Sequence, residues 1–180
     1  HYAPDALRVD APSDSSDYII QLTSMDMGST ANDIIEDENE FNRDPLSSDM
    51  HWILLEFWLY NEGTSTLAAN DVLSELAASK RFWTEYGQPM TIMDGATFSG
   101  DREDHGIYDV ELEPGEGDYV YVGILTKVNQ GLPVIALETS SGFTYIDTHP
   151  IDKWYQHEGS WYYYLADGGL VTGWKQIEGV

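Results

Sequence analysis

The sequence HWILLEFWLY, residues His51–Tyr60, is the strongest strand signal in this 180-residue chain. It is aromatic and aliphatic throughout, interrupted by charge only at Glu56, and it ends at the turn residues Asn61-Glu62-Gly63. Aromatic and branched side chains favour strands, and an apolar run bounded by turn residues is typical of a strand buried on both faces. The sequence therefore predicts a central strand here.

Shorter runs of the same kind lie on both sides of this segment. They are Tyr18–Thr23, Tyr119–Thr126, Val134–Glu138 and Phe143–Asp147. Turn residues, rather than regularly alternating helices, separate most of them, which favours antiparallel pairing over a βαβ arrangement. The sequence therefore predicts an all-β fold, with an antiparallel β-sandwich over residues 18–150.

Three segments are less regular. Asn70 is a fair N-cap and the apolar residues at 72, 73, 76 and 77 fall on one helical face, so we expect a short helix or an irregular turn, followed by a strand within 81–87. Residues 30–50 are expected to form an acidic loop with one helical turn at Ile34–Ile35. Residues 1–17 are polar and carry two prolines, so we expect a flexible lead-in.

Two motifs in the predicted sandwich resemble a known family. Leu54–Gly63 (LLEFWLYNEG) resembles the strand ending in Asn-x-Gly, and Leu112–Glu116 (LEPGE) the Pro-Gly turn, of the telokin-like, immunoglobulin-like domains of bacterial surface proteins and lipoproteins. The resemblance covers about residues 18–148 and implies an immunoglobulin-like β-sandwich. Long insertions at 30–50 and 94–110 depart from the family pattern.

The C-terminal residues contain a periodic aromatic pattern. Trp154 is followed five residues later by Gly159, and Trp174 is followed by Gly179 at an offset of 20 residues. A fixed period of this size indicates a repeat. Between the two tryptophans, the sequence predicts a β-hairpin with strands at 161–165 and 170–174 and a turn at 166–169.

This pattern, with Gly-Ser-Trp-Tyr-Tyr, Asp-Gly and Thr-Gly-Trp at 159–174, resembles the choline-binding or cell-wall-binding repeat of Gram-positive surface proteins and the related glucan-binding repeats. Lys153 replaces the expected Gly, and Tyr164 stands where Leu is usual. Residues 151–180 would then hold one complete repeat and the start of a second.

The resemblance implies that aromatic side chains bind a ligand. The residues carried over are Trp154, Trp161, Tyr163 and Trp174. Ring faces can hold the quaternary ammonium of choline on teichoic acid through cation–π attraction, or stack on the apolar faces of sugars in a glucan polymer. The alternative is that these rings only pack the hairpin or its contact with the sandwich.

Composition excludes several other functions. The chain has 8 Lys and Arg against 32 Asp and Glu, a formal net charge of −24, which disfavours binding to nucleic acid or anionic lipid. It has no cysteine, and no apolar run reaches the roughly 20 residues of a membrane-spanning helix. The acidic segments 37–44 and 101–105 lack the Gly and final Glu of an EF-hand loop. We expect no metal site, cofactor or catalytic residue.

We therefore expect a secreted, non-enzymatic surface protein that is associated with the cell wall. The hairpin would attach it to choline-bearing teichoic acid or glucan polymer, while the sandwich presents a surface to a possible protein partner. The alternative is an adhesion or interaction module in which the hairpin is structural or mediates dimerisation. A third reading is an accessory domain of an enzyme whose catalytic part lies outside these residues.

Overall fold

A computed structural model describes residues 7–45, 49–78, 82–84, 87–148, 153–157 and 160–164. The chain divides into two compact units, Ala3–Thr148 and His149–Val180. Among the described residues, the larger unit holds a five-stranded sheet, a three-stranded sheet, one further pair of short strands, two α-helices and the core, and the smaller unit holds one pair of strands. The described chain is mostly β with antiparallel sheets, which confirms the coarse fold prediction.

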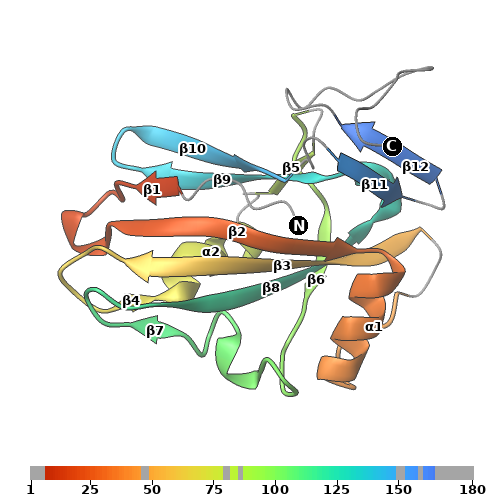
Figure 1. Cartoon of the computed structure of the whole chain (residues 1–180), viewed down its shortest axis with the longest axis horizontal. Helices are drawn as coiled ribbons and strands as arrows, with labels where there is room; N and C mark the ends of the chain where they lie inside the picture. The colour runs from red at the N-terminus through yellow and green to blue at the C-terminus, as the bar shows by residue number, and fades with distance from the viewer. Residues whose placement is uncertain are drawn as a thin grey trace. The chain divides into compact units, whose positions relative to one another are not determined.

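A five-stranded sheet is the centre of the larger unit (Figure 1). Its strands, in spatial order, are β1 (Leu7–Val9), β2 (Tyr18–Met27), β3 (Met50–Asn61), β8 (Gly117–Lys127) and β6 (Ile92–Gly95). All its strand pairs are antiparallel. The predicted strand at 51–60 is β3, and the apolar run is explained because β3 pairs along its length with both β2 and β8.

Strand β2 contains a bulge that keeps its apolar residues on one face. The register against β3 shifts between Leu22 and Ser24, so Thr23 is the extra residue. Before the bulge Ile20 and Leu22 are in the core, and after it Met25 and Met27 pack against the same core. Because alternation has a period of two, one inserted residue is what moves the buried set from even to odd positions.

The second sheet has three strands in the order β10 (Gly142–Asp147), β9 (Pro133–Thr139) and β5 (Phe82–Thr84). Two further short strands, β4 (Leu67–Ala68) and β7 (Glu111–Leu112), pair with each other. The strands predicted at 18–23, 119–126, 134–138 and 143–147 are therefore confirmed as β2, β8, β9 and β10, and that within 81–87 as β5.

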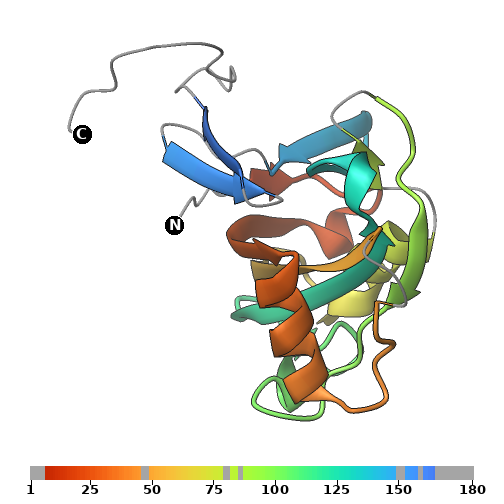
Figure 2. The same cartoon turned by 90° about the vertical axis from the view of Figure 1, so that its right-hand side faces the viewer.

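The two faces of the five-stranded sheet are covered by different elements. The main core joins one face, through Leu55, Phe57 and Ile124, to residues of the three-stranded sheet and of helix α2 (Ala69–Ala78). A smaller cluster joins the other face, through Trp52 and Leu125, to helix α1 (Ser29–Glu38). Figure 2 shows α1 and α2 on opposite sides of β2, β3 and β8.

Two sequence predictions are wrong in this unit. Residues 30–50 are not only a loop, because Ala31 and Ile35 lie on one face of the ten-residue helix α1 and are fully buried against the sheet. The flexible lead-in over 1–17 is corrected for 7–17, because β1 pairs with β2, Val9 is fully buried and a short 3-10 helix follows at Asp14–Ser16. Residues 1–6 lie outside the described residues.

The remaining segments are ordered by turns and short helices. The ambiguous segment at 70–77 is helical, within α2. Further 3-10 turns occur at Glu103–His105 and Val128–Gln130. No helix of the described chain is long and apolar enough to cross a membrane.

The smaller unit contains β11 (Lys153–His157) and β12 (Ser160–Tyr164), which pair antiparallel. The strand predicted at 161–165 is therefore found over 160–164. Its described partner is the strand that precedes it, which the sequence did not predict. The predicted return strand at 170–174 lies outside the described residues.

Candidate functional site

The paired strands β11 and β12, called the hairpin from here on, contain three of the four predicted ligand-binding positions. Trp154 lies opposite Tyr163, and Gln156 lies opposite Trp161. Cross-strand partners share a face, as do residues two apart on one strand, so positions 154, 156, 161 and 163 fall on one face of the hairpin. The fourth predicted residue, Trp174, lies outside the described residues.

The opposite face of the hairpin also carries aromatic positions. Tyr155 lies opposite Tyr162, and Lys153 lies opposite Tyr164. Sequence reasoning missed Tyr155 because it placed the partner strand after residue 165. The two residues that separate β11 from β12, Glu158 and Gly159, were the available signal, since two-residue links containing Gly are common in hairpins.

A second group of aromatic residues lies on the α1-side face of the five-stranded sheet. Trp58 of β3 and Tyr119 of β8 are register partners, and their rings meet edge to face with centroids 5.0 Å apart. Tyr119 is 44% exposed and Trp58 is half-buried. Gly117 allows this packing, because a Cβ there would lie 2.7 Å from Cζ2 of Trp58 and 3.0 Å from Cδ2 of Tyr60.

Hydrogen bonds to Glu56 continue this face toward α1. The Tyr121 hydroxyl donates to one carboxylate oxygen at 2.8 Å, and the hydroxyl of the bulge residue Thr23 donates to the other at 2.5 Å. Burial raises the pKa of Tyr121, and the hydrogen bond to Glu56 and its negative charge raise it further. The Arg102 guanidinium, 5.0 Å above the Tyr121 ring, opposes this shift but does not cancel it.

An ion pair joins α1 to the loop before the 3-10 turn at 103–105. Glu38 is 5% exposed, and its carboxylate accepts hydrogen bonds from the Arg102 side chain and from the backbone N–H groups of Gly100 and Arg102. Its own carbonyl accepts from the N–H and hydroxyl of Ser99. These contacts join the acidic segments 37–44 and 101–105, while Asp101, Glu103 and Asp104 of the second segment are exposed.

The described part of the chain contains no candidate metal site. No group of three or more His, Cys, Asp or Glu side chains is placed there to hold a metal ion. His105 directly follows Glu103 and Asp104 in the sequence, and its Nδ1 lies 3.6 Å from a carboxylate oxygen of Asp118. This contact is an ion pair only when the imidazole is protonated.

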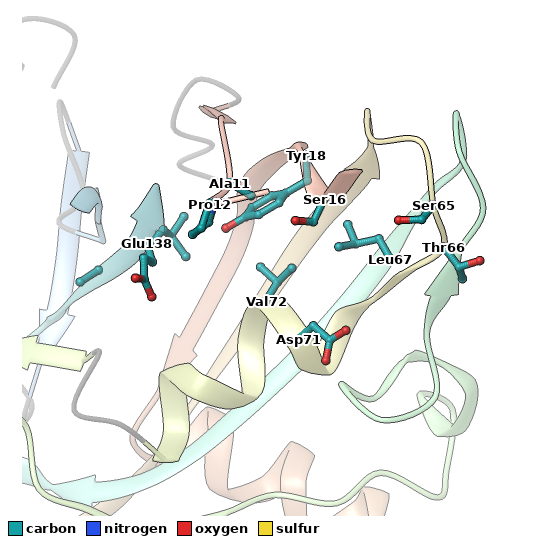
Figure 3. Close-up of a pocket in the computed structure, with 12 residues that line it drawn as sticks. Ala11, Pro12, Ser16, Tyr18, Ser65, Thr66, Leu67, Asp71, Val72 and Glu138 are labelled. Carbon is teal, nitrogen blue, oxygen red and sulfur yellow. The ribbon is translucent and has the colours of Figure 1, made fainter. Parts of the chain in front are cut away.

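The larger unit has a pocket of about 370 Å³ between the start of α2, β9 and the segment between β1 and β2 (Figure 3). Its wall and floor are formed by Ala11, Pro12, Ser16, Tyr18, Ser65, Thr66, Leu67, Asp71, Val72, Ala136, Leu137 and Glu138. The sequence did not predict this site, because its residues come from segments that only the folded topology brings together.

Comparison with known proteins gives no match to this chain. No family model matches it, and no curated protein and no solved structure matches it. The function must therefore be inferred from the residues and their geometry.

Proposed function

We propose that this chain is a non-enzymatic extracellular protein that attaches to a choline-bearing or glucan polymer of the cell wall through aromatic residues of its hairpin. The observation that carries the proposal is the register of β11 and β12, which puts positions 154, 161 and 163 on one face. Aromatic rings can hold flat apolar groups by stacking and cations by cation–π attraction.

Physical chemistry favours two ligand classes for such a surface. A quaternary ammonium cannot donate hydrogen bonds through its nitrogen, so it depends on ring faces, each contributing about 0.5–2 kcal/mol. The apolar faces of glucose rings can stack on the same indoles and phenols.

Charge also supports a neutral or cationic ligand. Residues 151–180 carry 4 acidic and 2 basic residues, whereas residues 1–150 carry 28 and 6. An anionic polymer without cationic substituents would be repelled by the whole chain.

The larger unit has a different part in this proposal. We propose that its two sheets, with the main core between them, form an immunoglobulin-like β-sandwich extended by α1 and α2. It would present its own surface to a protein partner. The face around Trp58 and Tyr119, where Tyr119 is 44% exposed, is one candidate surface for such a partner.

Isothermal titration of the full chain with choline chloride and with dextran tests the attachment role. We expect heat of binding from one of the two ligands. The variant Trp161→Ala should weaken binding about twofold to thirtyfold, as expected for the loss of one ring contact of 0.5–2 kcal/mol. Tyr162→Ala is the matched control, because position 162 lies on the opposite face of the same strand.

The outcomes separate the proposal from its rival. Absence of heat with both ligands, or equal losses in Trp161→Ala and Tyr162→Ala, would contradict attachment through this face. If Trp161→Ala instead changes the sedimentation coefficient of the chain without changing any ligand titration, the hairpin mediates dimerisation and the chain is an interaction module.

A further inference from the structure

The pocket of the larger unit has two chemically distinct parts. Its apolar part is built from side chains of the main core and its border, including Leu67, Val72 and Leu137. Its polar part consists of hydroxyl groups and two carboxylates, those of Asp71 and Glu138. In Figure 3, the Tyr18 ring lies across the opening from Val72, with Glu138 on one side and Leu67, Ser65 and Thr66 on the other.

The charges around the pocket have one sign. Among the described lining residues there is no Lys, Arg or His, whereas Asp71 and Glu138 are both exposed carboxylates. The chain as a whole carries a net charge of −24. The field in the pocket therefore attracts cations and repels anions, and the low-dielectric floor strengthens that preference.

The size of the pocket suits a small molecule. A volume of about 370 Å³ lies at the lower end of the range of roughly 300–1,000 Å³ that is usual for small-molecule sites. Buried aliphatic side chains and the Tyr18 ring offer contact to an apolar body, and the hydroxyl groups of Ser16, Ser65 and Thr66 can accept hydrogen bonds from an ammonium group.

We propose that this pocket binds a small organic ammonium ion, with its apolar body against Leu67, Val72 and Leu137 and its charged group toward the exposed carboxylate of Asp71. The larger unit then has a ligand site of its own, in addition to the hairpin. The inference does not depend on the function proposed for the hairpin, since every residue of the pocket belongs to the larger unit.

Three probes of nearly the same shape and different charge test the proposal on the full chain. They are benzylammonium, benzyl alcohol and benzoate, followed by amide chemical shifts in ¹H–¹⁵N spectra at constant ionic strength. Benzylammonium should shift the amides of Tyr18, Val72 and Leu137. It should bind about twofold to fivefold tighter than benzyl alcohol, the factor expected for an ion pair with an exposed carboxylate. Benzoate should bind more weakly than either.

A neutral variant tests whether the Asp71 carboxylate binds the ammonium group. Asp71→Asn should reduce the advantage of benzylammonium over benzyl alcohol by about twofold to fivefold, with little change for benzyl alcohol. Asp101→Asn is the control, because it removes the same charge from an exposed loop residue that does not line the pocket. Circular dichroism checks that each variant is folded, since Asp71 lies in the first turn of α2.

Several results would overturn the proposal. They are equal binding of the three probes, shifts confined to amides outside the pocket, and an effect of Asp101→Asn as large as that of Asp71→Asn. The variant Trp161→Ala distinguishes the two sites: it should leave the benzylammonium shifts of the pocket amides unchanged even where it weakens binding at the hairpin.

Discussion

Gly123 of β8 allows α1 and the segment after β6 to lie close to the five-stranded sheet. A Cβ added at Gly123 would lie 2.5 Å from Cβ of Ala96 and 3.1 Å from Cδ1 of Ile35. Carbon atoms in contact prefer about 3.5–4.0 Å, so the first distance is a severe overlap. The backbone N–H of Ala96 also donates to the carbonyl of Gly123 at 2.9 Å, which limits how far the segment can retreat.

The variant Gly123→Ala should therefore be less stable than the wild type. Overpacking a buried site costs about 1–3 kcal/mol. Alanine is favoured over glycine inside a strand by roughly 0.5–1 kcal/mol, so the net loss should be about 0.5–2 kcal/mol. Equilibrium unfolding in urea, followed by tryptophan fluorescence of the full chain, measures this difference.

A second substitution tests the cause. Ala96→Gly removes the overlapping methyl group, and the nearest remaining atom of residue 96 is then its Cα, at 3.7 Å. The double variant should recover about 1 kcal/mol relative to the sum of the single effects. Gly95→Ala is the control, because a Cβ there meets only the carbonyl oxygen of Gly123, at 4.0 Å. A Gly123→Ala chain as stable as wild type, or strictly additive effects, would refute the reasoning.

Three further changes have expected outcomes. Asn61 is fully buried; its side-chain NH2 donates to the carbonyls of Ser65 and Leu112, and its side-chain oxygen accepts from the N–H of Gly63. Asn61→Ala should lower the free energy of unfolding in urea by about 2–4 kcal/mol, because a buried carbonyl loses its partner. Glu38→Gln leaves the Arg102 guanidinium, which is 28% exposed, without its carboxylate partner. The free energy of unfolding should fall by about 2–3 kcal/mol, somewhat less than for breaking a fully buried ion pair. The raised pKa of Tyr121 means that the folded state holds this proton more tightly than the unfolded state, whose value is near 10.0. Its contribution is therefore complete below pH 10 and is lost as the pH rises through the folded-state pKa, so the stability advantage of wild type over Tyr121→Phe should shrink across that window.

Each of these expectations can fail clearly. Wild-type stability in Asn61→Ala would mean that water replaces the amide without loss. An unchanged unfolding curve for Glu38→Gln would show that the ion pair adds nothing over a neutral hydrogen bond. Parallel stability profiles of wild type and Tyr121→Phe from pH 9 to 12 would contradict the tighter hold on the Tyr121 proton.

The strands could be predicted from the sequence because local composition specifies them. The apolar run of β3 and the turn residues around it are visible without knowledge of any partner. Asn61 and Gly63 also have a local explanation, since the Asn61 side chain accepts from the N–H of Gly63, and a Cβ at Gly63 would lie 2.2 Å from the carbonyl oxygen of Ser15.

Helix α1 could not be predicted with the same ease because its buried face is short and partly charged. That face consists of Ala31, Ile35 and Glu38. A carboxylate in a buried position looks like part of an acidic loop until its partner is known, and Arg102 lies 64 residues away. The pocket could not be predicted either, because three segments that are far apart in the sequence form it.

The hairpin shows a mixed result. The aromatic run of β12 predicted a strand, and the register then related Trp154, Trp161 and Tyr163. The periodic pattern pointed to a partner strand after β12, at 170–174, which lies outside the described residues, and the pairing with the preceding β11 was missed.

The contact between Glu38 and Arg102 has a consequence for how this chain can change. The acidic segment after β2 and the glycine-rich segment after β6 are the two long additions to the predicted sandwich, and each supplies one charge of the pair. Shortening either segment alone would remove Glu38 or Arg102 and leave the other charge unpaired in a poorly hydrated position. The two additions should therefore be gained, lost or transplanted together, as a single inherited module rather than as independent loops.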